Sequence, residues 1–394
     1  MYRSMEFGPV PISPRSRKHG RKPATASLVD RPPVPHYDLR RGRGKGFREG
    51  LMKYRRFGNT GLVVSEVGFG GIPIQRVGDR EADEILRHAF DNGVTFYDTA
   101  AGYGTSEERI GKALEKVRDK CVIATKNQAA DAKTCRELFE RSLARLRTGY
   151  VDLFQFHNVA TEDRYAKVMA KGGAYEFAAE AKEKGRIRRI GFSSHGAKVS
   201  DVMVRSGLFE SIQYPFNLIG DAPAAGTFPE AVKRGMGVIA MKPFGGGAIE
   251  SAEAAFKFLR QFPDCIPIPG VQTKAELQEV LDIYAEENVV TDEDRAEWQR
   301  IRDEIGAVYC RRCGYCMPCP QGVEIATLTV MDSFVRRFPR ERMLGEEWMK
   351  AAESLDKCVE CGECETKCPY HLEIKVLMRR KRDAYMEWRK GAPR

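Results

Sequence analysis

The sequence predicts an α/β protein whose main part is a closed (β/α)8 barrel, in which eight parallel strands are each followed by a helix. From Val67 onward, short apolar runs alternate with longer stretches of helical periodicity. Eight such units fit into roughly 230 residues, a length typical of this barrel. No Gly-x-Gly-x-x-Gly motif follows the first apolar run, which disfavours an open dinucleotide-binding sheet.

The expected strands are rich in Val, Ile and Phe and almost continuously apolar, as is typical of parallel strands covered by helices. They cover residues 67–70, 94–98, 121–126, 151–157, 188–194, 211–216, 237–243 and 265–270. Between them, apolar residues return every three or four positions, which predicts helices. The clearest of these cover residues 81–92, 107–117, 134–146, 175–185 and 253–262, followed by a helix over 292–305.

Composition predicts a globular protein with one large and one smaller domain. The 394 residues are 42% hydrophobic and 30% charged, so the chain can bury a sizeable core. We expect the barrel over residues 52–305 and a separate cysteine-rich domain over residues 306–394. Since the sequence has neither a run of 18 apolar residues nor an apolar segment behind its first positive charges, we expect no membrane span and no secretory signal, and a cytoplasmic protein.

Residues 1–51 hold most of the net charge. They carry twelve Lys/Arg and four Asp/Glu, a net +8 of the total +10. Because this segment is rich in Pro and Arg and lacks apolar periodicity, we expect a disordered tail. Met52 opens a well-patterned segment, so a gene start placed too far upstream is one alternative, and a transit peptide is a weaker one. With the charge confined to this tail, we expect no specific nucleic-acid partner.

Four ionisable residues lie at or just beyond the ends of three consecutive expected strands. Asp98 ends the second strand and Tyr103 follows it, Lys126 ends the third, and His157 ends the fourth. In such barrels, reactive groups lie at the C-terminal ends of the strands. Each residue alone has a structural explanation, as a cap, a packing residue, a solvated strand end or a core histidine. Together at one rim, the four predict a catalytic site.

The chemistry that suits this set is proton donation by a phenol. A free tyrosine has a pKa of about 10, and a nearby ammonium lowers that value. Lys126 would supply the ammonium, and Asp98 would hold it charged and in place. His157 would hydrogen-bond a substrate carbonyl oxygen or relay its proton. Such donors would stabilise a carbonyl oxygen that gains charge as a hydride arrives at its carbon.

From Lys53 to about Asp282, the sequence resembles the aldo/keto reductase family. The segments that carry the resemblance are MKYRRFGNTGLVVSEVGFGG, YDTAAGYGTSEERIG, ATK and FQFH. The resemblance implies an oxidoreductase with a (β/α)8 barrel that binds NAD(P)H across its top and acts on a small-molecule substrate. It implies Tyr103 as the general acid, Lys126 and Asp98 as the residues that tune it, and His157 as the residue that orients the carbonyl.

The resemblance also implies contacts to the cofactor. By position, Ser193, Ser194 and Gln213 would hydrogen-bond the nicotinamide carboxamide. The loop that follows Gly270 would cover the adenosine end.

Three positions depart from the family pattern. Met241 stands where the family commonly stacks an aromatic ring on the nicotinamide, and offers a softer platform. The neighbouring Lys242 would meet the pyrophosphate or be solvated. Glu276 stands where many members grip a 2′-phosphate with Arg; because a carboxylate repels a phosphate but accepts from a 2′-hydroxyl, NADH and NADPH both remain open.

Eight of the eleven cysteines fall into two short runs near the C-terminus. They are Cys310, Cys313, Cys316 and Cys319, followed by Cys358, Cys361, Cys364 and Cys368. Clustered cysteines in a large chain without a secretory signal indicate metal ligands rather than disulfides. The gaps of two, two and three residues before a proline in the second run match the bacterial [4Fe–4S] spacing, whereas the last gap of the first run is two.

In two-cluster ferredoxins, the last cysteine of each run serves the other cluster. By that pattern, one cluster would be held by Cys310, Cys313, Cys316 and Cys368, and the second by Cys358, Cys361, Cys364 and Cys319. One cubane together with a different second site is an alternative. Zinc is another, although structural zinc sites draw two pairs from separated knuckles. The remaining cysteines, Cys121, Cys135 and Cys265, are expected to be inert core residues.

Helical patterns over 326–338 and 346–355 separate the two cysteine runs. The region therefore resembles a small, mainly helical, ferredoxin-like iron–sulfur domain with two [4Fe–4S] clusters, of the sort appended to a branch of aldo/keto reductase-like proteins.

Three functions remain open at this point. The first is NAD(P)H-dependent hydride transfer to or from a carbonyl-like substrate, coupled to electron transfer through both clusters. A cubane moves single electrons whereas nicotinamide moves a hydride, and the sequence shows no flavin motif. The second is a carbonyl reductase with structural clusters, and the third a nicotinamide-binding redox sensor, which would not need Tyr103. The basic segment 378–390 would dock an acidic ferredoxin or another redox partner, or form a solvated helix.

Overall fold

Eight parallel strands form the centre of the structure, a computed structural model that describes residues 52–391. They are β3 (Phe69–Gly70), β4 (Phe96–Asp98), β5 (Val122–Asn127), β6 (Val151–Phe156), β7 (Ile187–Ser193), β8 (Ser211–Pro215), β9 (Gly237–Met241) and β10 (Cys265–Ile268). Each strand pairs with the next along the chain. All eight predicted strands are confirmed, whereas the tail expected at 1–51 lies outside the described residues.

The barrel closes between its first and last strands. Gly68 N donates to Pro267 O at 2.8 Å, and Gly70 N donates to Pro269 O at 2.8 Å. This close approach requires glycine, because a Cβ on Gly70 would lie 2.7 Å from Ile268 O. The predicted (β/α)8 barrel is thereby confirmed.

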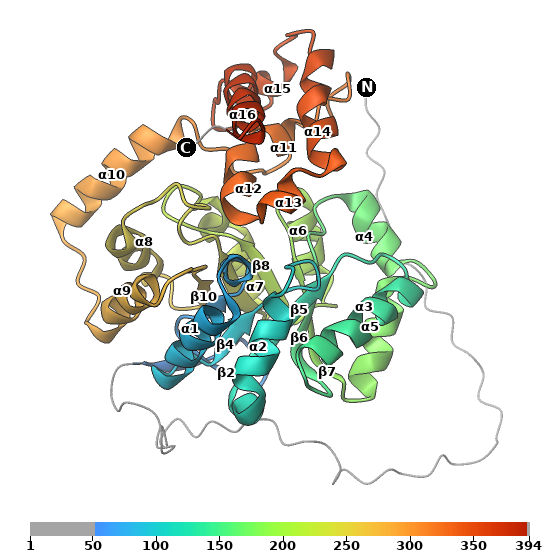
Figure 1. Ribbon diagram of the computed structural model, residues 1–394, viewed down its shortest axis with the longest axis vertical. Helices are drawn as coiled ribbons and strands as arrows, with labels where there is room; N and C mark the ends of the chain where they lie inside the picture. The colour runs from blue at the N-terminus through green and yellow to red at the C-terminus, as the bar shows by residue number, and fades with distance from the viewer. Residues whose placement is uncertain (1–51, 392–394) are drawn as a thin grey trace. The chain divides into compact units, whose positions relative to one another are not determined.

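Ten helices of the described chain follow or cover the barrel strands (Figure 1). They are α1 (Asp79–Asp91), α2 (Ser106–Leu114), α3 (Ala132–Arg145), α4 (Glu162–Met169), α5 (Ala174–Glu183), α6 (Ala197–Arg205), α7 (Thr227–Lys233), α8 (Ala252–Leu259), α9 (Lys274–Ala285) and α10 (Asp292–Gly306). In α1, the residues that repeat at helical spacing, Ala82, Ile85, Leu86 and Ala89, are the buried ones. The periodicity seen in the sequence is thus the face that packs on the strands.

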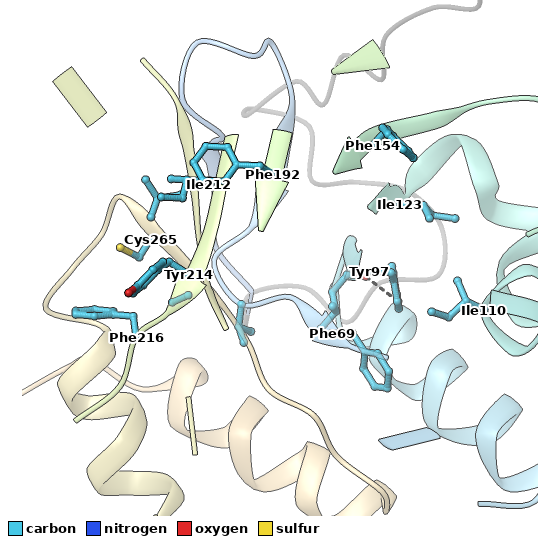
Figure 2. Close-up of a cluster of buried hydrophobic side chains, with 14 of the residues drawn as sticks. Phe69, Tyr97, Ile110, Ile123, Phe154, Phe192, Ile212, Tyr214, Phe216 and Cys265 are labelled. Atoms are coloured by element: carbon cyan, nitrogen blue, oxygen red, sulfur yellow. Dashed lines mark hydrogen bonds between the residues drawn. The ribbon is translucent and has the colours of Figure 1, made fainter. Parts of the chain in front are cut away.

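Figure 2 shows part of the large apolar cluster between the strands and these helices. Phe192 comes from β7 and Ile212 from the neighbouring β8, and both are fully buried. Cys121, Cys135 and Cys265 are free and buried, as predicted for inert core residues.

A short antiparallel hairpin precedes the barrel and was not predicted. It consists of β1 (Tyr54–Arg56) and β2 (Val63–Ser65). At its turn, Asn59 N donates to Gly235 O at 2.7 Å, close to the residue where β9 begins. The hairpin therefore covers the N-terminal ends of the strands, which leaves their C-terminal ends for a site.

The remaining helices build a second apolar cluster that includes Leu328, Met343, Met378 and Tyr385. The helices are α11 (Ile325–Leu328), α12 (Met331–Arg337), α13 (Arg340–Met343), α14 (Glu346–Glu353), α15 (Glu363–Thr366) and α16 (Ile374–Arg389). Short 3-10 turns occur at η2 (Pro73–Arg76), η3 (Glu115–Lys120), η4 (Ala222–Ala225) and η5 (Ser354–Lys357). The cysteine-rich region is mainly helical, as predicted. In the part of the chain that the structure describes, no helix has the length and apolar character to cross a membrane.

Candidate functional site

A buried ion pair lies at the C-terminal ends of β4 and β5. Lys126 Nζ donates to both carboxylate oxygens of Asp98, at 2.7 and 2.6 Å, and to Thr99 O at 2.6 Å. The pair forms because β4 and β5 are parallel neighbours whose side chains meet at one rim. Burial raises the pKa of Asp98 and lowers the pKa of Lys126, while the charge of each partner opposes the shift of the other. Three short hydrogen bonds to one ammonium favour the charged form of the pair.

Tyr103 and His157 lie against this pair. Lys126 Nζ is 5.1 Å from the centroid of the Tyr103 ring, and the rings of Tyr103 and His157 meet edge to face with centroids 5.6 Å apart. The turn that carries Tyr103 continues through Gly104, whose φ of +55° suits glycine. The structure thus brings together all four residues that the sequence predicted at this rim.

The acidity of the Tyr103 phenol differs from the sequence-based expectation. Burial raises its pKa, and the Asp98 carboxylate raises it further, whereas Arg337 and Arg342 oppose the rise. Lys126 is not among the main causes of the shift, because the Asp98 carboxylate, 2.6 Å from the ammonium, offsets part of its charge.

His157 lies in an environment that favours its neutral form. Burial and the charge of Lys126 lower the pKa of its imidazole to about 3. The ring is therefore uncharged at neutral pH, with one nitrogen available to donate and one to accept.

We call Asp98, Tyr103, Lys126 and His157 the tetrad. Beside it, Ser193 on β7 and Gln213 on β8 occupy paired positions. Gln213 Nε2 lies 3.4 Å from Asp98 Oδ1, and its carbonyl oxygen accepts from Gln155 Nε2 at 2.7 Å. Ser193 Oγ accepts from the backbone N of Asn158 at 2.9 Å. Buried amide and hydroxyl groups therefore lie on one side of the tetrad. Gln155 belongs to this polar group, although the sequence analysis did not identify it.

The other predicted nicotinamide contact, Ser194, is directed differently. Its Oγ accepts from Gly196 N at 3.0 Å, immediately before α6, and donates to Gly196 O at 3.3 Å. Its hydroxyl is thus used within its own turn.

The remaining cofactor candidates lie beyond β9 and β10. Met241 ends β9 and contacts the apolar cluster inside the barrel, and Lys242 has a positive φ of 60°. Gly270 allows a close approach of the chain, because a Cβ there would lie 2.7 Å from Pro73 Cγ. Glu276 is held at the start of α9, where its Oε2 accepts from Gln272 N at 2.7 Å.

The capping box that Glu276 forms with Thr273 gives its carboxylate a structural role. Its position in the sequence is therefore explained without a cofactor.

Cysteines from both runs line one cavity in the C-terminal region. Its empty volume is about 430 Å³, part of it open to solvent. The cysteines that line it are Cys316, Cys319, Cys358, Cys361 and Cys364. The last two cysteines of the first run thus stand among the first three of the second.

Another cysteine of the first run, Cys313, lies near the last cysteine of the second. The charges of Cys310 and Cys368 both raise the pKa of Cys313, after burial. Burial, with Cys310 and Cys313, raises the pKa of Cys316 to about 12. All eight thiols are free of disulfides. Across residues 52–391, no three His, Cys, Asp or Glu side chains converge closely enough to hold a single ion.

Comparison with known proteins agrees with this geometry. Residues 66–261 match the model of the aldo/keto reductase family, and residues 309–373 match that of the 4Fe-4S dicluster domain. L-Galactose dehydrogenase of Arabidopsis thaliana is 30% identical over 217 residues, which are 50% of this chain and 67% of the relative. The chain belongs to the aldo/keto reductase family. It also carries a 4Fe-4S dicluster domain.

Other relatives of this aldo/keto reductase family member match over different extents. Aldo-keto reductase YhdN of Bacillus subtilis is 32% identical over 189 residues, 42% of this chain and 54% of the relative. The chain therefore spans about half the length of that curated relative. The crystal structure of PA4992, a putative aldo-keto reductase from Pseudomonas aeruginosa, has a TM-score of 0.55 and 26% identity, covering 62% of this chain and 98% of that one.

The dicluster domain also contacts the rim of the reductase barrel. Arg342 Nη1 donates to Gly102 O at 2.8 Å, next to Tyr103. Ser333 Oγ donates to Gly246 O at 3.2 Å in the loop after β9, and Arg311 Nη2 to Ile219 O at 3.1 Å in the loop after β8.

The sequence analysis did not identify Arg342 and Arg311 as contact residues. For Arg311, the available signal was its place beside Arg312 between the first two cysteines, where neither arginine can serve as a thiolate ligand.

Proposed function

We propose that this protein is an NAD(P)H-dependent oxidoreductase that interconverts a carbonyl and an alcohol at the tetrad. The observation that carries the proposal is the buried Lys126–Asp98 pair beneath the ring of Tyr103, with His157 against the same ring. A phenol held beside a buried ammonium and a neutral imidazole is arranged for proton transfer to an oxygen.

When bound, the nicotinamide supplies or accepts the hydride at the carbonyl carbon. In the reducing direction, Tyr103 gives its phenolic proton to the carbonyl oxygen as the C–H bond forms. Lys126 stabilises the phenolate that remains, and neutral His157 donates its N–H to the same oxygen. Because burial raises the pKa of Tyr103, the phenol keeps its proton until a substrate oxygen takes it.

The residues beside the tetrad fit a nicotinamide carboxamide. The hydroxyl of Ser193 and the amide of Gln213 are buried at adjacent strand ends, and such groups can both donate to and accept from a carboxamide. Ser194 would contribute through its backbone position rather than its hydroxyl. The half-buried Met241 and Lys242 would border the cofactor beyond β9.

The test of this proposal is the Tyr103→Phe variant in NADH- and NADPH-dependent reduction of a panel of aldehydes and ketones. We expect a loss in kcat of about 10²- to 10⁴-fold, the range typical of a removed general acid. Tyr175→Phe, which removes a phenol bonded to Leu208 O, is the matched control and should keep its turnover. Equal activity of both variants would refute the assignment of Tyr103.

For the C-terminal domain, which we place from residue 306 onward, we propose two clusters held by thiols from both runs. One set is Cys310, Cys313, Cys316 and Cys368, and the other is Cys358, Cys361, Cys364 and Cys319. The cavity that Cys319 shares with the second run supports this exchange. When bound, such clusters supply single-electron transfer.

Electron transfer between this domain and the barrel is supported by proximity. The charge of Cys310 acts on both Lys242 and Tyr309, so the first set of thiols lies near the rim where the cofactor would bind. To test the coupling, dithionite-reduced protein is mixed anaerobically with NAD⁺, with and without added flavin. Oxidation of the clusters supports electron transfer, whereas an unchanged spectrum in both mixtures favours clusters that only brace the fold.

A redox partner would approach the second set of thiols. Cys361 is exposed, and the neighbouring Val359 is 63% exposed. Lys367 and Lys375 line the same cavity beside Glu360 and Glu363, and these lysines would contact an acidic partner such as a ferredoxin. Charge reversal with Lys375→Glu should slow reduction by an acidic ferredoxin at low ionic strength, and an unchanged rate would exclude this surface.

A further inference from the structure

Three cations from distant parts of the sequence lie together at the rim of the barrel. Lys242 follows β9, Arg312 lies between two cysteines, and Arg337 ends α12. Both guanidinium groups lie against the ring of Phe334. The distance from the ring centroid is 5.3 Å to Cζ of Arg312 and 5.4 Å to Cζ of Arg337. We call Lys242, Arg312 and Arg337 the rim cations.

The position of the rim cations is fixed by contacts between the dicluster domain and the loop after β9. Ser333 Oγ donates to Gly246 O at 3.2 Å, and a Cβ on Gly246 would lie only 3.9 Å from Cζ of Arg337. Gly245 N in turn donates to Lys242 O at 2.9 Å. Arg337 is therefore held against the loop that carries Lys242.

The rim cations have no acidic partner within the described range 52–391, where none of them forms an ion pair with Asp or Glu. Arg312 Nε is buried without a hydrogen-bond partner, as is His195 Nε2 beside them. Burial and the charge of Arg312 lower the pKa of Arg337 to about 10. Placing like charges together is unfavourable unless an anion joins them. The Cys310 thiolate offsets part of the charge of Lys242 and Arg312, whereas the groups that raise the pKa of Arg337 are the phenols of Tyr309 and Tyr103.

The backbone supports a specialised role for Lys242. It has a positive φ of 60°, in the left-handed region that side-chain-bearing residues rarely adopt. Such backbone conformations are concentrated at ligand-binding and catalytic sites.

We propose that the rim cations bind an anionic group, a carboxylate or phosphate, carried by the substrate near its reacting carbonyl. The charge of Arg337 acts on Lys242 and also on Tyr103, so the rim cations lie near the phenol of the tetrad. Guanidinium groups match the planar carboxylate and the phosphate by paired hydrogen bonds. The reacting carbonyl rests on the proposed function, but the anion site itself does not.

Binding of a non-reacting anion tests the site without turnover. Anaerobically prepared holoprotein is titrated calorimetrically with succinate and, separately, with inorganic phosphate, in the absence of nicotinamide. We expect wild-type binding of at least one probe and a loss of about tenfold or more in Arg337→Gln and in Lys242→Met, since each variant removes a charge-assisted contact. Lys242→Met lies in the barrel and leaves the cysteine runs intact.

The matched control is Arg380→Gln, on an exposed part of α16, which should bind the probes as the wild type does. Iron quantification in each variant excludes loss of the clusters as the cause. Absence of binding by wild-type protein, or equal binding by all variants, would overturn the proposal.

Kinetics then separate the substrate from the cofactor diphosphate as the source of the anion. Succinic semialdehyde and butanal form an anionic and neutral pair of similar length. We expect Arg337→Gln to lower the ratio of their kcat/KM values by about tenfold and to leave the affinity for NADPH, measured by fluorescence titration, unchanged. Weaker NADPH binding with an unchanged ratio would assign the site to the cofactor and refute the proposal. Succinate binding without any carbonyl turnover would instead refute the proposed function and leave the anion site standing.

Discussion

At the scale of single residues, the strand ends were predictable and the electrostatics were not. Asp98, Lys126 and His157 could be placed at one rim from the sequence because parallel strands of a barrel end on the same side. The pKa of Tyr103 could not be predicted, since it depends on burial by loops and on arginines from residues more than 200 positions away. Sequence analysis does not reveal neighbours that are so far apart along the chain.

The Lys126–Asp98 pair gives a prediction for stability. Asp98→Asn leaves the Lys126 ammonium, 1% exposed, without its counter-ion. We expect the free energy of unfolding to fall by about 3–5 kcal/mol, the cost of breaking a buried pair, measured by urea denaturation under anaerobic conditions. Arg300→Gln breaks the exposed Arg300–Glu304 pair and should cost less than about 1 kcal/mol. Equal small losses in both variants would contradict the buried charge.

His157 gives a prediction for the pH dependence of stability. Its pKa is lowered from 6.5 to about 3 in the folded protein, so the unfolded chain binds the proton more readily. Its contribution to stability is therefore complete above pH 6.5 and is lost as the pH falls toward 3. The free energy of unfolding measured across this window should fall less steeply with decreasing pH in His157→Gln than in wild type. Parallel curves would contradict a neutral, buried imidazole.

At the scale of elements, periodicity located the long helices and the barrel strands, whereas the first hairpin escaped. The hairpin strands β1 and β2 have three residues each and no helix between them, so they lie outside the strand–helix alternation that located barrel strands as short as β3 and β4. Glu276 has two interpretations. The Thr-x-x-Glu pattern of Thr273 and Glu276 is itself a helix-start signal, but a comparison with family positions made it a candidate for the cofactor.

The role of Glu276 in α9 is open to test. Glu276→Ala removes the side-chain acceptor for Gln272 N and half of the capping box. We expect it to lower the free energy of unfolding by about 0.5–2 kcal/mol with no change in the ratio of NADH to NADPH activity. Glu279→Ala, an exposed position on the same helix, is the control for helix propensity. If Glu276→Ala changes the coenzyme preference and Glu279→Ala does not, Glu276 contacts the cofactor.

At the scale of the whole molecule, the two functional parts were evident from composition and cysteine spacing. Their mutual contact was not, because Arg342, Ser333 and Arg311 bond to backbone carbonyls of barrel loops. Backbone acceptors leave no sequence pattern, so this interface emerges only from the folded chain. It makes the dicluster domain part of the rim rather than an independent appendage.

The shared cavity predicts how the domain responds when one thiol is removed. In Cys361→Ala, the second set of thiols loses one member, while the first set keeps all four of its own. We therefore expect iron to fall from about eight to about four atoms per chain, measured by colorimetry after anaerobic purification. Cys265→Ala, a buried cysteine of β10 outside both runs, should retain all of its iron. Because Cys310, near Lys242, belongs to the set that survives, the rim should keep its shape and carbonyl reduction should continue. Complete loss of iron in Cys361→Ala would show that the two sets cannot be filled separately.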